Sequence, residues 1–446
     1  MTELFFIFSQ FFIIYFLSLL NVFALINKNY YLKFFSFSEN LTFNLIIFLN
    51  FILLVSFFNV GLVFIISSYL TYCAILFLIY LINYKILINI NRLNTFYFVI
   101  LFISSSIIFI QIANDLVIGW DAQKFWIYKT LNFFNGNSIS NLSNLSNSWY
   151  PYLGSLSWSF FWKISLLEHE YSGRLFYVFI YLISLLLITN NLKISIFNKV
   201  IFFLLIIILS YDYTIHSHWS MFSGFQEILI FSLLSMAIHF LYKFANSNYK
   251  SENLNLFSIL LICNLLVWIK HEGFIISLSL ILTLIFFFKF ESSKKIFISV
   301  FFFLILFIRF FIFEFYELNS SDIQHHGFEE ISIENILDKI SFSRIPIILK
   351  YLFLNIFTNY LMLIGIFILL LFLLTKKKMK KLNYIFFLII FNLSSFCFIY
   401  LITTSLDLSF LLQSGMDRVI YQLCPITFLI IFEFINKKNF ISKINL

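Results

Sequence analysis

Residues 256–288 read LFSILLICNLLVWI-KHEG-FIISLSLILTLIFFF, two uncharged apolar runs on either side of the ionisable residues Lys270, His271 and Glu272. Long uncharged runs of this kind predict helices that cross a membrane. The short polar break between them predicts a tight turn at a membrane face. Residues 256–269 and 273–288 are therefore expected to form a helical hairpin.

The same pattern extends over the whole chain of 446 residues, which is 61% apolar and only 11% charged. A soluble domain carries about 25% charged residues, so a water-soluble protein is excluded. A membrane β-barrel is excluded as well, because its strands alternate apolar and polar residues. The four cysteines lie in apolar runs and predict neither a disulfide nor a metal site. The expected fold class is an all-α polytopic membrane protein, with residues 1–446 forming one transmembrane domain.

The apolar runs predict about thirteen membrane-spanning helices. These runs lie near residues 4–26, 42–57, 62–82, 97–113, 173–190, 197–210, 224–242, 256–269, 273–288, 296–313, 347–374, 383–403 and 419–436. Two longer polar stretches separate some of them. We expect a first large loop at 114–172 and a second at 314–345.

Basic and acidic side chains fall in alternate loops. Lysines crowd one set, for example 376–381 and 437–443, whereas acids such as Asp121, Glu227 and Asp417 occupy the other set. Under the positive-inside rule the lysine side is cytoplasmic. The N-terminus and both large loops are then external, and the C-terminus is cytoplasmic. The net charge of +8 reflects this topology, so a nucleic-acid partner is not expected.

The 114–172 loop begins with a cluster of acidic, basic and aromatic residues. Asp121 is followed by Lys124 and Lys129 and is flanked by Trp120 and Trp126. On a helix, both lysines would lie near the Asp121 side. The carboxylate is then either a general base beside a bound phosphate or part of an interfacial helix with a solvated ion pair.

Two histidine pairs lie on the same predicted external side. His216 and His218 match part of a metal site, but no third ligand is near in sequence. The lining of a polar cleft is therefore the favoured interpretation. His325 and His326 lie in the acidic 314–345 loop, where a solvated pair is expected. No metal site is predicted.

Three ionisable clusters interrupt or flank apolar runs on that side. Glu227 lies just inside a run, where a carboxylate needs a partner. Lys270 and Glu272 form either a plain solvated turn or a site for a lipid phosphate at the headgroup level. Arg418 follows Asp417 at the entrance to the last run and opposes the local charge bias, and its fork geometry suits a phosphate.

Together these residues resemble the C-superfamily of membrane glycosyltransferases, in particular bacterial members related to protein mannosyltransferases and aminoarabinose transferases. The matching motifs, in chain order, are Gly119-Trp120-Asp121-Ala122 with Trp126 and Lys129, then Tyr150-Pro151, then Lys270-His271-Glu272-Gly273, and finally Asp417-Arg418 with Pro425. Two features depart from the family pattern. About four spans precede the first large loop, and the nearest second acid in that loop is Asp115.

The resemblance implies transfer of a sugar from a polyprenyl-phosphate-linked donor to an acceptor at the external face of a bacterial inner membrane. It assigns Asp121 as the base or as the residue that positions the acceptor. It assigns Lys129, Lys270 and Arg418 to the donor phosphate. Further substrate contacts are expected from Trp120, Trp126, Tyr150, Glu227, His271 and Glu272. No cofactor is implied, and no divalent cation is indicated.

Two other functions stay open at this point. An O-antigen-type polymerase or ligase would share the lipid-linked substrate but rely on external arginines and histidines. The available external arginines are Arg174, Arg309, Arg344 and Arg418. A transporter or flippase of lipid-linked glycans would instead place polar groups near the bilayer midplane, where few charges are predicted.

Overall fold

The structure, a computed structural model, describes residues 2–19, 36–83, 92–145, 147–211, 221–246, 252–318, 342–374, 382–402 and 408–436. Every regular element in these ranges is helical, which confirms the all-α class for this part of the chain. Many of the helices are both long and apolar. The protein is therefore an integral membrane protein.

The described ranges contain the following helices in chain order. The first half contains α1 (Thr2–Leu19), α2 (Phe37–Ser56), α3 (Leu62–Asn83), α4 (Arg92–Asp115), α5 (Ile127–Phe134), α6 (Leu153–Lys163), α7 (Tyr171–Thr189) and α8 (Ile196–Ser210). The second half contains α9 (Glu227–Asn246), α10 (Glu252–Ile269), α11 (His271–Phe287), α12 (Ser292–Phe315), α14 (Ile345–Thr358), α15 (Tyr360–Leu374), α16 (Leu382–Ile402), α17 (Leu408–Leu423) and α18 (Thr427–Asn436). Single turns of π- or 3₁₀-helix are η1 (Ala122–Trp126), η2 (Ser140–Asn144), η4 (Phe342–Arg344) and η5 (Cys424–Ile426).

The described residues contain fewer membrane-length helices than the thirteen predicted. Nine are long and apolar enough to cross a membrane, or up to ten if a bent pair counts as one span. Three predicted spans, 4–26, 197–210 and 273–288, correspond to the shorter helices α1, α8 and α11. A bilayer core needs about 20 helical residues, so these three are short for an upright crossing.

The apolar run 347–374, predicted as one span, is two helices. α14 and α15 meet at an angle of 90°. The break is at Asn359, whose backbone is extended and whose Oδ1 accepts the N–H of Met362. A side chain that caps the next helix competes with continuation of the preceding one. Hydropathy alone does not detect this break, because the residues on both sides are equally apolar.

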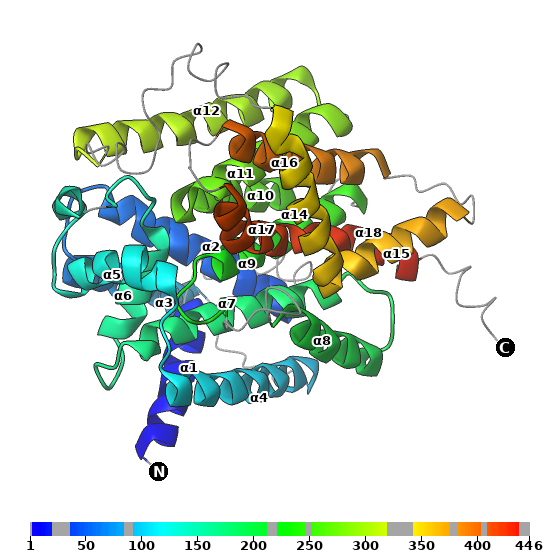
Figure 1. The fold of residues 1–446 in the computed structure, drawn as a ribbon. Coiled ribbons are helices and arrows are strands. Elements are labelled where there is room, and N and C mark those ends of the chain that lie inside the picture. The colour runs from blue at the N-terminus through cyan, green and yellow to red at the C-terminus, as the bar shows by residue number, and fades with distance from the viewer. Residues whose placement is uncertain are drawn as a thin grey trace.

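The centre of the bundle is formed by α2, α7, α9 and α10. α7 packs against α9 and α2, and α10 packs against α9 and α2. The span in α7 is wholly buried, whereas at most 33% of the span is buried in α3, α4, α12 and α16. In Figure 1, α12 and α4 lie on opposite sides of the view with α9 between them. Exposed phenylalanines on α12, such as Phe303 and Phe307, suit contact with lipid chains.

The 114–172 segment is mostly helical and is packed into the bundle. α6 lies in the segment that was expected to form the first large loop, but it is a helix that is buried along most of its length. Its Ser155 and Ser159 hydroxyls donate to the carbonyls of Trp126 and Thr130 in the η1–α5 segment. α6 also packs against α7. This segment therefore forms part of the protein core.

Parts of the predicted polar loops lie outside the described residues. In the 314–345 loop the structure describes only residues up to 318 and from 342 onward. His325 and His326 lie outside the described ranges, as do His216 and His218. The lysine-rich stretches 376–381 and 437–443 lie outside them as well.

Candidate active site

Asp121 is placed by a non-helical segment that follows α4. Residues 116–119 are not helical, and the backbone N–H of Gly119 donates to the carbonyl of Ser223 at 2.8 Å. A Cβ at Gly119 would lie 2.4 Å from the ring of Phe225. Only glycine therefore allows the two segments to approach this closely. The single π-helical turn η1 begins directly after Asp121, a feature that is frequent at functional sites.

Glu227 is the first residue of α9, and the segment before it is shaped by Gly224. Gly224 has φ +90°, a left-handed conformation that favours glycine. A Cβ there would also lie 2.6 Å from the ring of Trp158 and 2.9 Å from Ala122. The residues before Asp121 and those before Glu227 are thus packed directly against each other.

Lys270 lies at the break between α10 and α11. Its backbone is extended, and its carbonyl accepts the N–H of Gly273 at 3.1 Å. A Cβ at Gly273 would lie 2.0 Å from the carbonyl oxygen of Leu266. The tight turn predicted between the two apolar runs is confirmed, and Gly273 permits the two helices to meet so closely.

Arg418 was expected at the entrance of the last span. In the structure it lies within α17. α17 begins at Leu408 because the residues from Leu408 to Leu412 are themselves mostly apolar. The Arg418 Nε donates to the carbonyl of Ser414, and the guanidinium lies over the ring of Phe225 at 5.8 Å. These contacts direct the side chain toward the start of α9.

These side chains form one continuous ion network. The Arg418 guanidinium pairs directly with Asp121 and lies 3.4 Å from Glu227 Oε1. Lys270 Nζ lies 2.8 Å from the same Glu227 oxygen and 2.9 Å from Glu272 Oε1. Five residues from distant parts of the sequence therefore meet at one end of the bundle. We call Asp121, Glu227, Lys270, Glu272 and Arg418 the ion network.

The ion network is poorly exposed and carries an excess of negative charge. Its three carboxylates face two cations, and Glu227 is fully buried. Burial alone would lower the pKa of Lys270, but the carboxylates of Glu227 and Glu272 outweigh it and raise that pKa above its usual range. Lys270 is therefore a permanent cation. Glu227 Oε2 is buried and accepts no hydrogen bond within the described structure, so one carboxylate oxygen is available to another donor.

Lys129 lies apart from the carboxylates of the ion network, although it was expected on the Asp121 side. Its ammonium donates to the carbonyls of Ser148 and Tyr150. It is 1% exposed, and no ion pair involves it among the described residues. Burial lowers its pKa well below the usual range. It borders a small cavity of about 140 Å³ that the exposed Lys124 also lines.

The aromatic residues expected near the substrate divide into two groups. Tyr150 lies close enough to Lys270 and Glu272 for their charges to act on it, and burial raises its pKa to about 12. The rings of Trp126 and His271 lie 5.5 and 5.1 Å from the Tyr150 ring. Trp120, by contrast, is 59% exposed, as is typical of an aromatic anchor at a membrane surface.

One functional candidate was not singled out from the sequence. Arg309 in α12 donates to His271 Nδ1 and to the carbonyl of Val267, both at 2.9 Å. Because a guanidinium only donates, His271 Nδ1 accepts and its proton lies on Nε2. That Nε2 is buried without a hydrogen-bond partner in the described part of the chain. The available signal was a lone arginine inside an apolar run.

Known proteins offer no guide to the role of this ion network. The chain matches no known family model, no curated protein and no solved structure. The resemblance to membrane glycosyltransferases therefore rests on the motifs alone. Among the residues with described structure, no group of three or more His, Cys, Asp or Glu side chains is arranged to hold a metal ion.

An apolar groove lies between α11 and α16. It has a volume of about 500 Å³ and is lined by Phe274 and Leu278 of α11 and by Phe391, Phe398 and Ile399 of α16. Each wall contains a residue that is close in sequence to Glu272 or to Tyr400. Phe274 lies two residues after Glu272, and Ile399 precedes Tyr400, which is within electrostatic range of Glu272 and Arg418.

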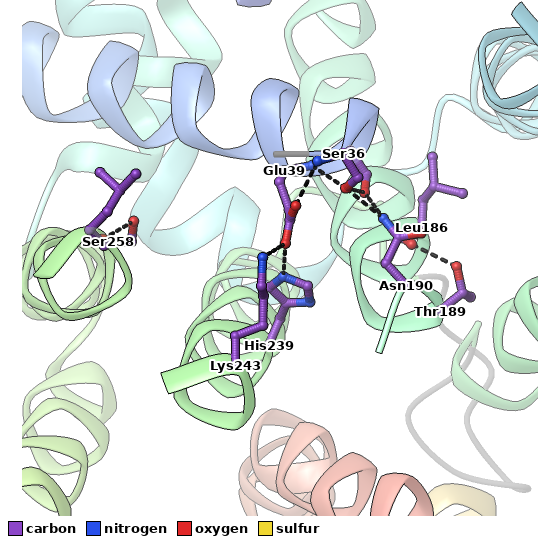
Figure 2. Close-up of polar contacts among 10 residues, drawn as sticks. Ser36, Glu39, Leu186, Thr189, Asn190, His239, Lys243 and Ser258 are labelled. Carbon is purple, nitrogen blue, oxygen red and sulfur yellow. Dashed lines mark hydrogen bonds and ion pairs between the residues drawn. The ribbon is translucent and has the colours of Figure 1, made fainter. Parts of the chain in front are cut away.

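A second buried ion cluster lies toward the opposite end of α9 (Figure 2). Glu39 Oε1 lies 2.8 Å from His239 Nε2 and 2.6 Å from Lys243 Nζ. Glu39 Oε2 accepts the backbone N–H of Ser36 at 2.7 Å, which completes a capping box at the start of α2. At about 1.5 Å per residue, His239 lies roughly 18 Å along α9 from Glu227. We call Glu39, His239 and Lys243 the Glu39 cluster.

Proposed function

We propose that this protein is a membrane glycosyltransferase that takes its sugar from a polyprenyl-phosphate-linked donor. The observation that carries the proposal is the meeting of Asp121, Glu227, Lys270 and Arg418 at one end of an apolar helical bundle. Paired carboxylates and cations in a poorly hydrated site suit displacement of a phosphate from a sugar. The charge pattern of the loops predicts that this end is external, at the surface of a bacterial inner membrane.

The ion network has the groups that such a displacement needs. A hydroxyl or amine of the acceptor attacks the sugar carbon that carries the phosphate, and a carboxylate takes the proton. Asp121 is the proposed base, and the free Oε2 of Glu227 is a further acceptor for a substrate proton. The bond from sugar to phosphate breaks, and the polyprenyl phosphate leaves with the electron pair. Nearby cations stabilise the leaving phosphate.

The distribution of charge favours one orientation of the donor. Asp121, Glu227 and Glu272 already neutralise Lys270 and Arg418, so the ion network alone would repel a phosphate. Lys129 and Arg309 have no carboxylate partner among the ion pairs of the described structure, and both act electrostatically on His271. We therefore propose that the phosphate binds toward Lys129, His271 and Arg309, and the acceptor toward Asp121 and Glu227.

The groove between α11 and α16 suits the polyprenyl chain. Its walls are mostly apolar, and its lining residue Phe274 lies two residues after Glu272 in the sequence. Each contact between an isoprenoid carbon and the wall contributes only about 0.1–0.2 kcal/mol, but a long chain makes many such contacts. A chain held in this groove would present its phosphate to the charged residues at the end of α11.

Transfer by the purified chain tests the proposal directly. The protein is reconstituted in vesicles with undecaprenyl phosphate linked to a radiolabelled hexose or pentose, together with a membrane extract as acceptor source. We expect label to leave the lipid donor, and Asp121→Asn to reduce that rate at least about 100-fold. Glu39→Gln is the matched control because it also removes a buried carboxylate charge. No release of label from any donor would refute the proposal.

A transporter would give a different result in a labelling experiment. A cysteine placed at Gln123, which is exposed beside Asp121, is treated with a membrane-impermeant thiol reagent from each side of the vesicle. An enzyme that works at one face is labelled from that face only. Alternating access would expose the cysteine from both sides in turn and would favour the transporter.

A further inference from the structure

Arg174 is a buried arginine that contacts none of the side chains of the ion network. It lies in the first turn of α7 and is 1% exposed. Its Nε and one terminal nitrogen donate to the two carboxylate oxygens of Glu170, each at 2.9 Å. This bidentate pair fixes the plane and direction of the guanidinium.

The remaining terminal nitrogen of Arg174 binds two backbone carbonyls from separate segments. It donates to Val117 at 2.9 Å and to Phe222 at 3.3 Å. Val117 lies four residues before Asp121, and Phe222 lies five residues before Glu227. Both segments lack regular helical hydrogen bonds at these points, so contacts from outside determine their positions.

The two segments are also joined to each other. The Gly119 N–H donates to the carbonyl of Ser223. Gly119 lies two residues after Val117, and Ser223 lies one residue after Phe222, the two residues whose carbonyls Arg174 binds. Gly119 packs on Phe225, and Gly224 packs on Ala122. Arg174 therefore binds two segments that also contact each other. Together these contacts determine the position of Asp121 relative to Glu227.

We propose that Arg174 is a positioning residue for the two carboxylates Asp121 and Glu227, through the carbonyls of Val117 and Phe222. This inference rests on the proposed function, because it gives the paired carboxylates a role in transfer. Reacting groups must be held within about 0.5 Å of their productive geometry. A displacement of about 1 Å can cost about 100-fold in rate. Arg174 thus acts on turnover without touching the substrate.

The proposal separates turnover from donor binding. Arg174→Lys keeps the charge opposite Glu170 but loses the planar fork, so it cannot hold both carbonyls. We expect it to lower kcat for transfer at least about tenfold, with the KM for the lipid donor changed less than about threefold. Lys163→Gln is the matched control because it breaks the exposed pair with Glu168 at 3.8 Å, and its kcat should stay unchanged. A normal kcat in Arg174→Lys would overturn the proposal.

A second measurement does not depend on catalysis. Asp121→Cys is made with Arg174 intact and in combination with Arg174→Lys, and the alkylation rate at position 121 is followed by mass spectrometry. We expect at least a tenfold faster reaction when the arginine is absent, because the segment before position 121 is released. Glu170→Gln, which weakens the orientation of Arg174, should give an intermediate rate.

The two measurements distinguish failure of this inference from failure of the proposed function. If the wild-type chain transfers no sugar, the proposed function is wrong, and the alkylation rates still decide whether Arg174 positions the segment. Equal alkylation rates in the three backgrounds overturn the positioning role. A fall in kcat that only follows the fraction of folded protein also overturns it, because the role would then be purely structural.

Discussion

The ion network and the Glu39 cluster lie toward opposite ends of α9. They differ in how many oxygens of their buried carboxylate have a hydrogen-bond partner. At the Glu39 cluster both carboxylate oxygens are used, one by His239 and Lys243 and the other by the Ser36 N–H. At the ion network Glu227 Oε1 is shared by Lys270 and Arg418. Glu227 Oε2 accepts no hydrogen bond in the described structure.

We propose that this difference between the two carboxylates separates a structural from a functional ion cluster. The difference concerns the carboxylate oxygens only, because His239 Nδ1 of the Glu39 cluster also has no hydrogen-bond partner in the described structure. A buried carboxylate whose oxygens are all satisfied holds helices together, here the start of α2 against the end of α9. A buried polar atom left unsatisfied costs free energy, and such costs are typical of sites that bind a missing partner. The ion network also has more carboxylates than cations, whereas the Glu39 cluster has one carboxylate and two basic groups.

The largest difference between the clusters should appear in transfer activity. Glu227→Gln removes the buried carboxylate whose Oε2 accepts no hydrogen bond in the described structure, but it leaves Lys270 paired with Glu272 and Arg418 paired with Asp121. We expect a loss of kcat in the range of about 10²- to 10⁴-fold, as for removal of an acid–base group, with the fold retained. Initial rates of label transfer from the lipid donor measure it. Activity within tenfold of wild type would mean that Glu227 has no part in proton transfer.

The Glu39 cluster should matter for the stability of the fold rather than for transfer activity. Glu39→Gln leaves His239 and Lys243 without a carboxylate, and removing one partner of a buried ion pair costs about 3 kcal/mol or more. We expect a clear fall in the thermal unfolding midpoint in detergent, with kcat per folded molecule unchanged. Glu252→Gln is the matched control, because Glu252 and Lys294 are both partly exposed and 3.8 Å apart, and such pairs contribute about 1 kcal/mol or less. An equal effect of the two variants would show that the Glu39 cluster is not structural.

Lys129 sharpens the comparison because it is a buried lysine outside both clusters. Replacing it by methionine removes a donor to the proposed phosphate while keeping the volume of the side chain. We expect the affinity for undecaprenyl phosphate to fall about tenfold, which corresponds to about 1.4 kcal/mol. Lys124→Met is the control because Lys124 lines the same cavity but is exposed. Unchanged affinity in both variants would show that the phosphate does not bind at Lys129.

The smallest effect is a pH dependence of stability at Lys129. Burial lowers the pKa of Lys129 in the folded chain, whereas the unfolded chain keeps a value near about 10.4. Between the two values the unfolded state binds more protons, so stability rises as the pH increases toward 10.4. We expect the thermal midpoint of wild type, relative to Lys129→Met, to rise by a small but measurable amount from pH 7 to pH 9.5. A constant difference between the two midpoints would contradict this.

Residue type and position in the sequence are enough to identify most of the ion network. Asp121, Glu227, Lys270 and Arg418 stand out because ionisable residues are rare in a chain that is only 11% charged. The structure differs from the sequence prediction at Lys129. The prediction placed this side chain on the Asp121 side, but its ammonium donates to the carbonyls of Ser148 and Tyr150. Every residue carries a backbone carbonyl, so the sequence pattern could not indicate these partners.

The roles of Arg174 and Arg309 could not be read from side-chain patterns. Both arginines donate to backbone carbonyls, those of Val117, Phe222 and Val267, and every residue carries a carbonyl. The break at Asn359 was missed for a similar reason. It depends on one amide side chain that caps α15, inside a run whose hydropathy does not change.

The amino-acid sequence alone determined that the chain is helical and lies in a membrane. A lipid environment offers backbone groups no water, so long apolar runs must satisfy their own hydrogen bonds as helices. Only the tertiary structure decided which charges meet. Asp121 and Arg418 are 297 residues apart, and their pairing depends on how α9, α10 and α17 pack and on glycines that allow close approach. Glu39 and Glu227 are both buried acids in the structure, and the packing around them makes one a structural contact between helices and the other a candidate catalytic group.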